Sequence, residues 1–190
     1  MGRNPTVSDV DVLNRLSQVF RDVGYQGATL SMLEQASGLK KASLYHRFPR
    51  GKEQMAAEVL AFAGRWVSEN VLAVLQGPGK PRARVSRVTR SLKEFYAGGE
   101  KACLLNMLAP TQVLGELFSD TIRQMFEAWI EALATVARDA GVSSRQARAR
   151  AERVVMLMQG SLVMSRGMGT TRPFELFVKS IPHELGLTNA

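Results

Sequence analysis

Apolar residues recur at spacings of three and four through nearly the whole chain, and no other feature of the sequence constrains the fold as strongly. Near the start they place Val12, Leu13, Leu16, Phe20 and Val23 on one stripe, as in an amphipathic helix. The sequence has no sustained alternation of polar and apolar residues and no Asn-Gly or Asp-Gly pair, which are the signals of strands and hairpins. The pattern therefore predicts an all-α fold.

Turn-forming residues divide this pattern into separate helices. We expect the first helix to begin at Ser8, which can cap it, and to end at Val23, before Gly24. The remaining helices are expected at about residues 30–37, 41–48, 52–75, 82–97, 102–108, 113–140, 144–167 and 173–181.

The second helix is short and is followed by a glycine turn at Gly38. Thr29 is its expected N-cap, against a competing capping box formed by Ser31 and Glu34. Its inner face is expected to consist of Leu30, Leu33 and Ala36.

The third helix is too short to be stable alone, so it must dock on its neighbours. Leu44 and Phe48 lie four residues apart and should both point inward. The outer side is then left to Ala42, Ser43, His46 and Arg47, with Tyr45 at the flank. A supporting helix followed by two short helices around a glycine turn is a helix-turn-helix, whose last helix can enter the major groove of DNA.

The charge distribution agrees with an acidic partner. The chain has 25 Lys and Arg residues against 17 Asp and Glu, which gives a net charge of +8. Between Gln35 and Lys52 there is no acidic residue, but there are five cations: Lys40, Lys41, Arg47, Arg50 and Lys52. Such clustering costs self-repulsion unless a polyanion neutralises it, so it favours nucleic acid as the partner. Two further basic runs, at residues 80–90 and 145–153, are interpreted as solvated helix starts or faces.

Length and composition exclude several classes of protein. The 190 residues suit one ordinary domain, or two small ones that share a core. No stretch approaches the ~20 apolar residues of a membrane span, and the start lacks a secretory pattern. A single cysteine, Cys103, and only two histidines argue against a disulfide framework and a metal site. No cofactor is implied, and the composition fits the reducing cytoplasm.

Several strings within about the first 60 residues occur together in one known family. They are Gly24-Tyr25, Ala28-Thr29-Leu30, Ala36-Ser37-Gly38-Leu39, Ser43-Leu44-Tyr45-His46-Arg47-Phe48 and Gly51-Lys52-Glu53. As a set they resemble the TetR family of transcriptional regulators. The segment from Phe48 to Lys52 has one residue more than the commonest form, which is similar to the subgroup of the LmrA and YxaF type.

The resemblance implies a helix-turn-helix DNA-binding domain at residues 1–52 and a helical domain for effector binding and dimerisation at residues 53–190. Thr29, Tyr45 and Lys52 would touch phosphates, and residues 40–43 would open the recognition helix. Three alternatives stay open: Tyr45 as a half-buried core residue, His46 as a surface residue without contacts, and Lys52 as a helix start only. The whole set implied to contact double-stranded operator DNA is Thr29, Lys40, Lys41, Ala42, Ser43, Tyr45, His46, Arg47 and Lys52.

Two positions depart from the family pattern. Lys40 stands where a small capping residue is usual, and a cation at a helix N-terminus is unfavourable by ~0.3–1 kcal/mol unless an anion such as phosphate lies there. Glu34 stands where alanine is usual, and it is expected to point outward.

The helix expected at residues 144–167 is apolar on all sides from Val154 to Met158, so it should be buried on all sides. In a domain of this size, one face can meet the core and another a second subunit. The resemblance implies a homodimer in which this helix and the one at 113–140 pair with their twins, with close approach at Gly160 and Ser161. The alternative is a wholly internal helix. The interface candidates are Trp129, Met156, Gly160, Val163 and Met164.

Nine methionines and several aromatic residues predict an adaptable apolar interior. The functional interpretation is a pocket for a small apolar or aromatic effector, and the alternative is plain core packing. The candidate pocket residues are Phe62, Trp66, Phe95, Met107 and Phe126.

These observations predict a DNA-binding transcriptional regulator, a dimeric repressor that an effector releases from its operator. One alternative is a DNA-binding regulator without a small effector. Another is a small helical enzyme, but the sequence lacks the nucleophile-elbow, zinc-protease and dinucleotide-binding motifs, and it offers only His46 and His183 for acid–base chemistry. We therefore expect no enzymatic activity.

Overall fold

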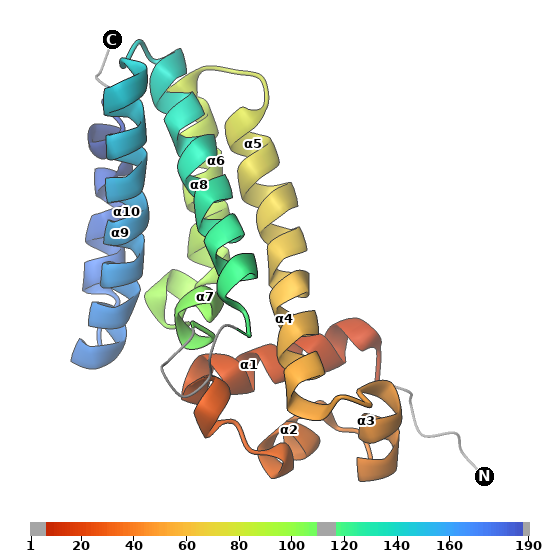
Figure 1. Cartoon of the computed structure of the whole chain (residues 1–190). Coiled ribbons are helices and arrows are strands. Elements are labelled where there is room, and N and C mark those ends of the chain that lie inside the picture. Colours follow the sequence, from red (N-terminus) through yellow and green to blue (C-terminus); the bar gives the residue numbers. More distant parts are fainter. Residues whose placement is uncertain (1–6, 110–116, 188–190) are drawn as a thin grey trace. The chain divides into compact units, whose positions relative to one another are not determined.

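The structure is a computed structural model that describes residues 7–109 and 117–187. These residues are mostly helical and contain no strand, which confirms the all-α expectation (Figure 1). The α-helices are α1 (Asp9–Gly27), α2 (Leu30–Ser37), α3 (Lys41–Arg47), α4 (Gly51–Val67), α5 (Ala73–Gln76), α6 (Pro81–Phe95), α7 (Leu104–Met107), α8 (Ser119–Asp139), α9 (Ser144–Met168) and α10 (Arg172–Glu184).

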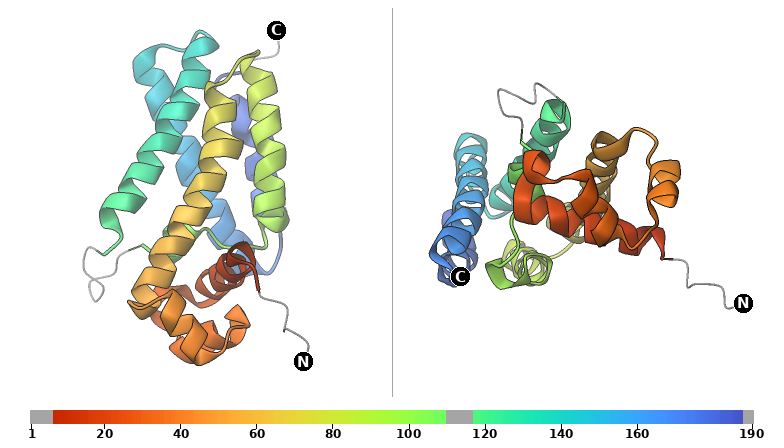
Figure 2. Two further views of the ribbon diagram at one scale, coloured as in Figure 1. Left: turned by 90° about the vertical axis from the view of Figure 1, so that its right-hand side faces the viewer. Right: turned by 90° about the horizontal axis from the view of Figure 1, so that it is seen from below.

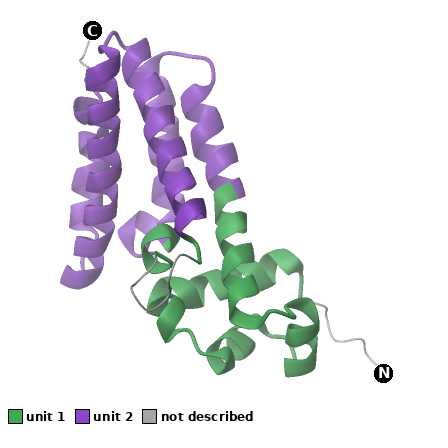
Figure 3. Cartoon of the chain, in the orientation of Figure 1, with its two compact units in different colours: residues 1–64, 104–118 green, residues 65–103, 119–190 purple. Residues whose placement is uncertain are grey.

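The chain divides into two compact units, which Figure 3 shows in different colours. Unit 1 is formed by Met1–Gly64 and Leu104–Phe118, so it holds α1, α2, α3, most of α4, and α7. Unit 2 is formed by Arg65–Cys103 and Ser119–Ala190, and it holds the end of α4 and the other helices. This division falls inside α4. The domain boundary expected after residue 52 remains a prediction.

Helix α1 begins where the sequence predicts and ends later. Ser8 caps it by accepting a hydrogen bond from the backbone N–H of Asp11 at 3.1 Å. The helix then continues to Gly27 through a kink at Gly24, whose φ of 70° and ψ of 179° are accessible to glycine almost alone. Val23 was expected in the buried stripe but is 39% exposed, because the stripe ends where the chain bends.

Helices α2 and α3 agree with the expected bounds to within one residue. The hydroxyl of Thr29 caps α2 by accepting a hydrogen bond from the backbone N–H of Met32 at 3.2 Å. Gly38 ends α2 in the left-handed conformation, with φ of 71°. Leu44 and Phe48 are buried beneath α3, as predicted.

The inner face of α2 differs from the expected one. Leu33 is buried, but Leu30 is 42% exposed. Ser37, four residues after Leu33, is the second buried residue of this helix. Its hydroxyl donates to the carbonyl of Glu34 at 2.8 Å and accepts from the backbone N–H of Leu39 at 3.1 Å. A serine can lie in the interior when both of its hydrogen-bonding roles are filled nearby.

Unit 2 is a bundle of packed helices. Helix α9 packs along α8 and along α10, and the two views of Figure 2 show α8 and α9 beside each other. Helix α6 begins with Pro81 in its first turn, where a missing N–H costs nothing. The interior of the unit includes Val71, Leu75, Val88, Leu92, Trp129, Leu133, Met158, Phe174 and Phe177.

A π-helical turn at Ser68–Leu72 joins α4 to α5, so one unbroken helix runs from Gly51 to Gln76. The sequence predicts this helix at residues 52–75 but gives no sign of the π turn. The side-chain amide of Asn70 donates to the carbonyl of Trp66 at 2.9 Å, which satisfies a carbonyl beside the turn. A π turn takes in one more residue than an α turn.

Helix α9 has an exposed side in the single chain, so it is not the wholly internal helix of the alternative. Val154, Val155 and Met158 are buried, but Met156 is 65% exposed, because the helices that pack against α9 leave this side uncovered. The helix expected at residues 113–140 corresponds to α8, which begins at Ser119. Residues 113–116 of that expectation lie outside the described residues.

Candidate nucleic-acid interface

Helix α3 presents an exposed polar surface on a buried anchor. Leu44 and Phe48 hold it against the interior of unit 1. The side chains at residues 42 and 43 are small and exposed, and the phenol-bearing side chain of Tyr45 is exposed beside them. The exposed residues of the helix are Lys41, Ala42, Ser43, Tyr45 and His46.

Two further candidates lie beside this surface in the sequence. Lys40 is the N-cap residue of α3 and is exposed, and its side chain makes no capping hydrogen bond. Thr29 is exposed at the start of α2, and its hydroxyl oxygen already accepts a hydrogen bond from Met32. The hydroxyl hydrogen of Thr29 can still be donated to an acceptor such as a phosphate oxygen.

Arg47, in contrast, is held by side chains of two other helices. Its Nη1 and Nη2 atoms donate to the two carboxylate oxygens of Glu58 in α4 at 3.1 and 2.7 Å. Its Nε atom donates to a carboxylate oxygen of Asp9 in α1 at 3.2 Å. The guanidinium carbon lies 4.6 Å from the centre of the Phe48 ring. Each guanidinium nitrogen therefore has a partner within unit 1.

Gln54 extends this network along α4. Its Nε2 atom donates to Glu58 at 2.9 Å, and its Oε1 atom accepts from the backbone N–H of Arg50 at 3.1 Å. Sequence reasoning missed Asp9, Gln54 and Glu58. The spacing of four between Gln54 and Glu58 is visible in the sequence, but Arg47 meets its two acidic partners across 38 and 11 residues of chain.

The network shifts two pKa values. The hydrogen bond to Glu58 is the largest of the causes that raise the pKa of Arg47 above its usual value. Burial raises the pKa of Glu58, but the hydrogen bonds from Arg47 and Gln54 and the positive charge of Arg47 outweigh burial, so this pKa lies below its usual value. Both side chains are therefore charged at neutral pH.

Lys52 also has partners inside unit 1. Its ammonium group donates to the backbone carbonyl of Tyr25 at 3.0 Å and lies 4.6 Å from the centre of the Tyr25 ring. Tyr25 lies in the last turn of α1, where a cation interacts favourably with the helix dipole and, here, with a ring face. Among the described residues no ion pair involves the other three cations of this stretch, Lys40, Lys41 and Arg50, which are all exposed.

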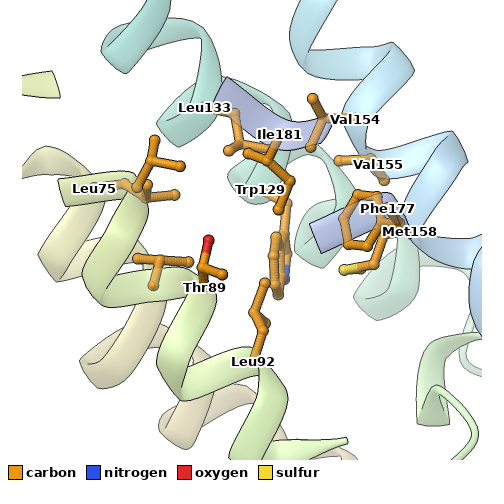
Figure 4. A pocket seen from close by; sticks show the side chains of 12 residues that line it. Leu75, Thr89, Leu92, Trp129, Leu133, Val154, Val155, Met158, Phe177 and Ile181 are labelled. Carbon is orange, nitrogen blue, oxygen red and sulfur yellow. The ribbon is translucent and has the colours of Figure 1, made fainter. Parts of the chain in front are cut away.

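A cavity lies inside unit 2, and its wall is almost wholly apolar (Figure 4). Among its lining side chains, Thr89 has the one hydroxyl and Trp129 the one N–H group. A charged group placed there would lose its water without gaining a partner, so the wall suits an uncharged, apolar molecule. The lining residues are Leu75, Val85, Val88, Thr89, Leu92, Trp129, Leu133, Val154, Val155, Met158, Phe177 and Ile181.

The five residues predicted to bind an effector do not line this cavity. Phe62 and Met107 belong to unit 1, whereas the cavity lies within unit 2. Trp66 and Phe95 stack on each other with their ring centres 4.0 Å apart, and Phe126 is half-buried on α8. The cavity wall is built mostly from aliphatic residues, which no sequence signal separates from ordinary core residues.

An exposed apolar face runs along α9. Met156, Val163 and Met164 are each more than half exposed, and Gly160 is exposed among them. These are four of the five residues predicted at a dimer interface. Trp129, the fifth, is buried in unit 2 and lines the cavity, because it lies on the inward side of α8.

Three other features bear on the sequence expectations. Within residues 7–109 and 117–187, no helix has both the length and the hydrophobicity of a membrane span. In the same part of the chain, no three His, Cys, Asp or Glu residues are grouped in a way that could hold a metal ion. Cys103 is buried, with the hydroxyl of Tyr96 at 3.6 Å and the amide of Gln159 at 3.4 Å from its sulfur.

Two family models match this sequence. Residues 81–180 match the C-terminal domain of LmrA/YxaF-like transcriptional regulators. Residues 13–59 match the tetR family of bacterial regulatory proteins. The two matches fall on the helix-turn-helix region and on most of unit 2.

Individual proteins are similar over almost their full length. YxaF of Bacillus subtilis (strain 168), an uncharacterized HTH-type transcriptional regulator, is 23% identical over 174 residues, which cover 90% of this chain and 91% of YxaF. A TetR transcriptional regulator from Legionella pneumophila has a similar solved structure, with a TM-score of 0.81 and 20% identity over 95% of this chain and 98% of that one. A cysteine mutant of the TetR family regulator CifR, solved with 26-bp double-strand operator DNA, has a TM-score of 0.72 and 22% identity over 96% of this chain and 98% of that one.

Proposed function

Because this chain belongs to the TetR family of transcriptional regulators, with a C-terminal domain of the LmrA/YxaF type, we propose that it is a homodimeric repressor that leaves its DNA operator when it binds a small apolar molecule. Members of this family are transcription factors rather than enzymes, which agrees with the absence of catalytic motifs from the sequence. We place the protein in the cytoplasm, where bacterial chromosomal DNA lies.

The observation that carries the DNA-binding proposal is the exposed surface of α3. The helix is anchored from below by Leu44 and Phe48, and small side chains on its outer side permit close approach to a groove. The neighbouring cations Lys40, Lys41 and Arg50 have no acidic partner among the described residues, so their charge is available to phosphates. CifR, a relative by fold, is solved with operator DNA.

Footprinting on the DNA that flanks the gene, followed by fluorescence anisotropy on the protected fragment, tests this proposal. The logarithm of the association constant should fall linearly with the logarithm of salt concentration, with a slope of about −0.9 for each phosphate that is neutralised. Replacing Lys41 by Met should weaken binding and make the slope shallower by about 0.9. A chain that binds no duplex even at low ionic strength would refute the proposal.

The homodimer proposal rests on the exposed apolar face of α9. A soluble chain that leaves Met156, Val163 and Met164 largely uncovered gains from burying them against a second copy, and exposed Gly160 lets the two helices approach closely. A dimer also suits DNA, because two recognition helices can then occupy half-sites about 34 Å apart.

The effector proposal rests on the apolar cavity in unit 2, which has room for about one water molecule, so the helices around it must move apart to admit an effector. Release requires the effector to bind the DNA-incompetent state more tightly, and a shift from roughly 1:99 to 99:1 needs about 5.5 kcal/mol of differential binding. Neutral aromatic and aliphatic compounds should raise the melting temperature by mass action, whereas charged analogues of the same size should not. The variant Val88→Phe, which fills the space, should lose this response and keep DNA affinity. No response to any compound would favour the alternative, a regulator without a small effector.

A further inference from the structure

Arg47 lies on the recognition helix, but its positive charge is already balanced within unit 1. Asp9 and Glu58 both bond to its guanidinium, so one cation faces two carboxylates and the local charge of the three side chains is negative. A phosphate brought to this group would be repelled by the two carboxylates. Arg47 is therefore poorly suited to contact DNA, although it is one of the five cations of the acid-free stretch.

The geometry of the network is that of a structural tie. Arg47 donates from two nitrogens to the two oxygens of Glu58, and this bidentate pair fixes the orientation of the guanidinium as well as its distance. Gln54 donates at 2.9 Å to Oε1 of Glu58, the oxygen that also accepts from Nη1 of Arg47, so the carboxylate is itself positioned. The bond to Asp9 adds the first helix, and α3 is thereby linked to both α1 and α4.

This network adds a constraint that the two buried anchors of α3 do not provide. The helix is seven residues long, and its buried contacts come from Leu44 within it and Phe48 just after it. Two anchors four residues apart fix a line, but a short helix can still roll about that line. Arg47 leaves α3 about 100° away from Phe48 around the helix axis, so its tie opposes this roll.

We propose that Arg47 is a positioning residue, which with Asp9 and Glu58 sets the roll of α3 so that its exposed face meets the DNA groove, and that it makes no phosphate contact itself. This inference rests on the proposed function as a DNA-binding regulator. It gives Arg47 a role different from the DNA contact that the family resemblance implies.

The substitution Glu58→Gln distinguishes a phosphate-binding role of Arg47 from a positioning role, because the two roles predict opposite changes in DNA affinity. If Arg47 bound a phosphate, Glu58→Gln would free the cation and remove a competing negative charge, so DNA would bind more tightly. If Arg47 positions α3, the same change breaks the tie and DNA binds more weakly.

The test uses the full chain, a fluorescent duplex that the wild type selects from a random library, and an unselected duplex of equal length. The variants are Arg47→Met, Glu58→Gln and the double variant, with Lys41→Met as the control for a phosphate contact. Each single change in the network should weaken binding to the selected duplex by roughly three- to thirtyfold, and the double variant should be no weaker than the worse single variant. The salt slope should stay at the wild-type value for Arg47→Met and fall by about 0.9 for Lys41→Met.

The double variant distinguishes a specific loss of DNA recognition from partial unfolding. It removes one positive and one negative charge, so its net charge stays at +8, and its affinity for the unselected duplex should equal that of the wild type. A variant that is partly unfolded would lose affinity for both duplexes and would melt at a lower temperature.

Three results would overturn the inference while the proposed function stands: tighter binding by Glu58→Gln, a shallower salt slope for Arg47→Met, or wild-type affinity of Arg47→Met for the selected duplex. If the wild type itself binds neither duplex, the proposed function fails, and the inference fails with it.

Discussion

At the scale of single residues, Gly24 has a backbone conformation that favours glycine. Its φ of 70° and ψ of 179° lie in a region that other residues avoid, and an added Cβ would lie 3.3 Å from the carbonyl oxygen of Met107. Gly24→Ala should therefore lower the free energy of unfolding by about 1–3 kcal/mol, measured by urea denaturation.

The matched control is Gly167→Ala, in α9, where an added Cβ meets no atom within 4 Å. This change should be neutral or slightly stabilising, because alanine is the better helix former. Equal changes in the free energy of unfolding for the two substitutions would contradict a special cost of alanine at Gly24.

Glu58 should contribute a pH dependence of stability in the acid range. Its pKa in the folded chain lies below its value of about 4.5 in the unfolded chain, so its contribution is fully present above that pH and is lost as pH falls through the folded value. The free energy of unfolding, measured by urea denaturation at a series of pH values, should therefore fall more steeply below pH 4.5 for the wild type than for Glu58→Gln. Parallel curves for the two proteins would contradict the pKa shift.

Local signals were sufficient for some residues and not for others. Thr29, Gly38 and Leu44 have their roles fixed by neighbours within four residues, and the structure places each as the sequence predicts. Lys52 and Arg47 carry a charge that the sequence assigns to DNA, but their partners lie far along the chain, in α1 for both and also in α4 for Arg47. Charge counting cannot separate a cation that faces solvent from one that a fold has already paired.

At the scale of helices, Arg84 joins three elements of unit 2. Its Nη1 atom donates to the carbonyl of Leu75 in α5 at 2.8 Å, and its Nη2 atom pairs with Asp139, the last residue of α8, at 2.5 Å. The sequence interpretation treats the basic run at residues 80–90 as solvated, but the Arg84 side chain is only 4% exposed. The interior carbonyl and Asp139 make this burial tolerable.

Removing either partner of this pair should have unequal effects. Asp139→Asn leaves a buried cation without its counter-charge and should lower the free energy of unfolding by about 1–3 kcal/mol. Arg84→Met removes the charge and keeps much of the volume, so it should cost less. Urea denaturation measures both, and Asp120→Asn, which breaks an exposed ion pair with Arg123, should have no measurable effect. A larger loss of unfolding free energy for Arg84→Met than for Asp139→Asn would contradict this account.

The bounds of the helices were largely predictable because turn residues mark them. Which side of each helix is buried was harder to predict. The composition of α9 around Met156 is apolar all round, and only the placement of its neighbours decides which side is covered. The cavity wall could not be predicted for the same reason: Val88 and Leu133 look like ordinary core residues until the facing helices are in place.

At the scale of the whole molecule, the exposed face of α9 should determine the oligomeric state. A charge at the centre of an apolar interface is strongly unfavourable, so Val163→Glu or Met164→Glu should convert a dimer to a monomer, measured by light scattering on a sizing column. The control is Val10→Glu, an equally exposed valine in unit 1, which should leave the dimer intact. A monomeric wild type, or dimers in all three variants, would refute this interface.

The π turn at Ser68–Leu72 has a consequence for every residue that follows it in the same rod. One additional residue within a helical turn rotates the downstream side chains by about 100° relative to an uninterrupted α-helix. Leu75 owes its place in the cavity wall to that offset. Deleting a single amino acid between 68 and 72 would therefore let this turn close as an ordinary α-helical turn, and Leu75 would still face the space it now borders.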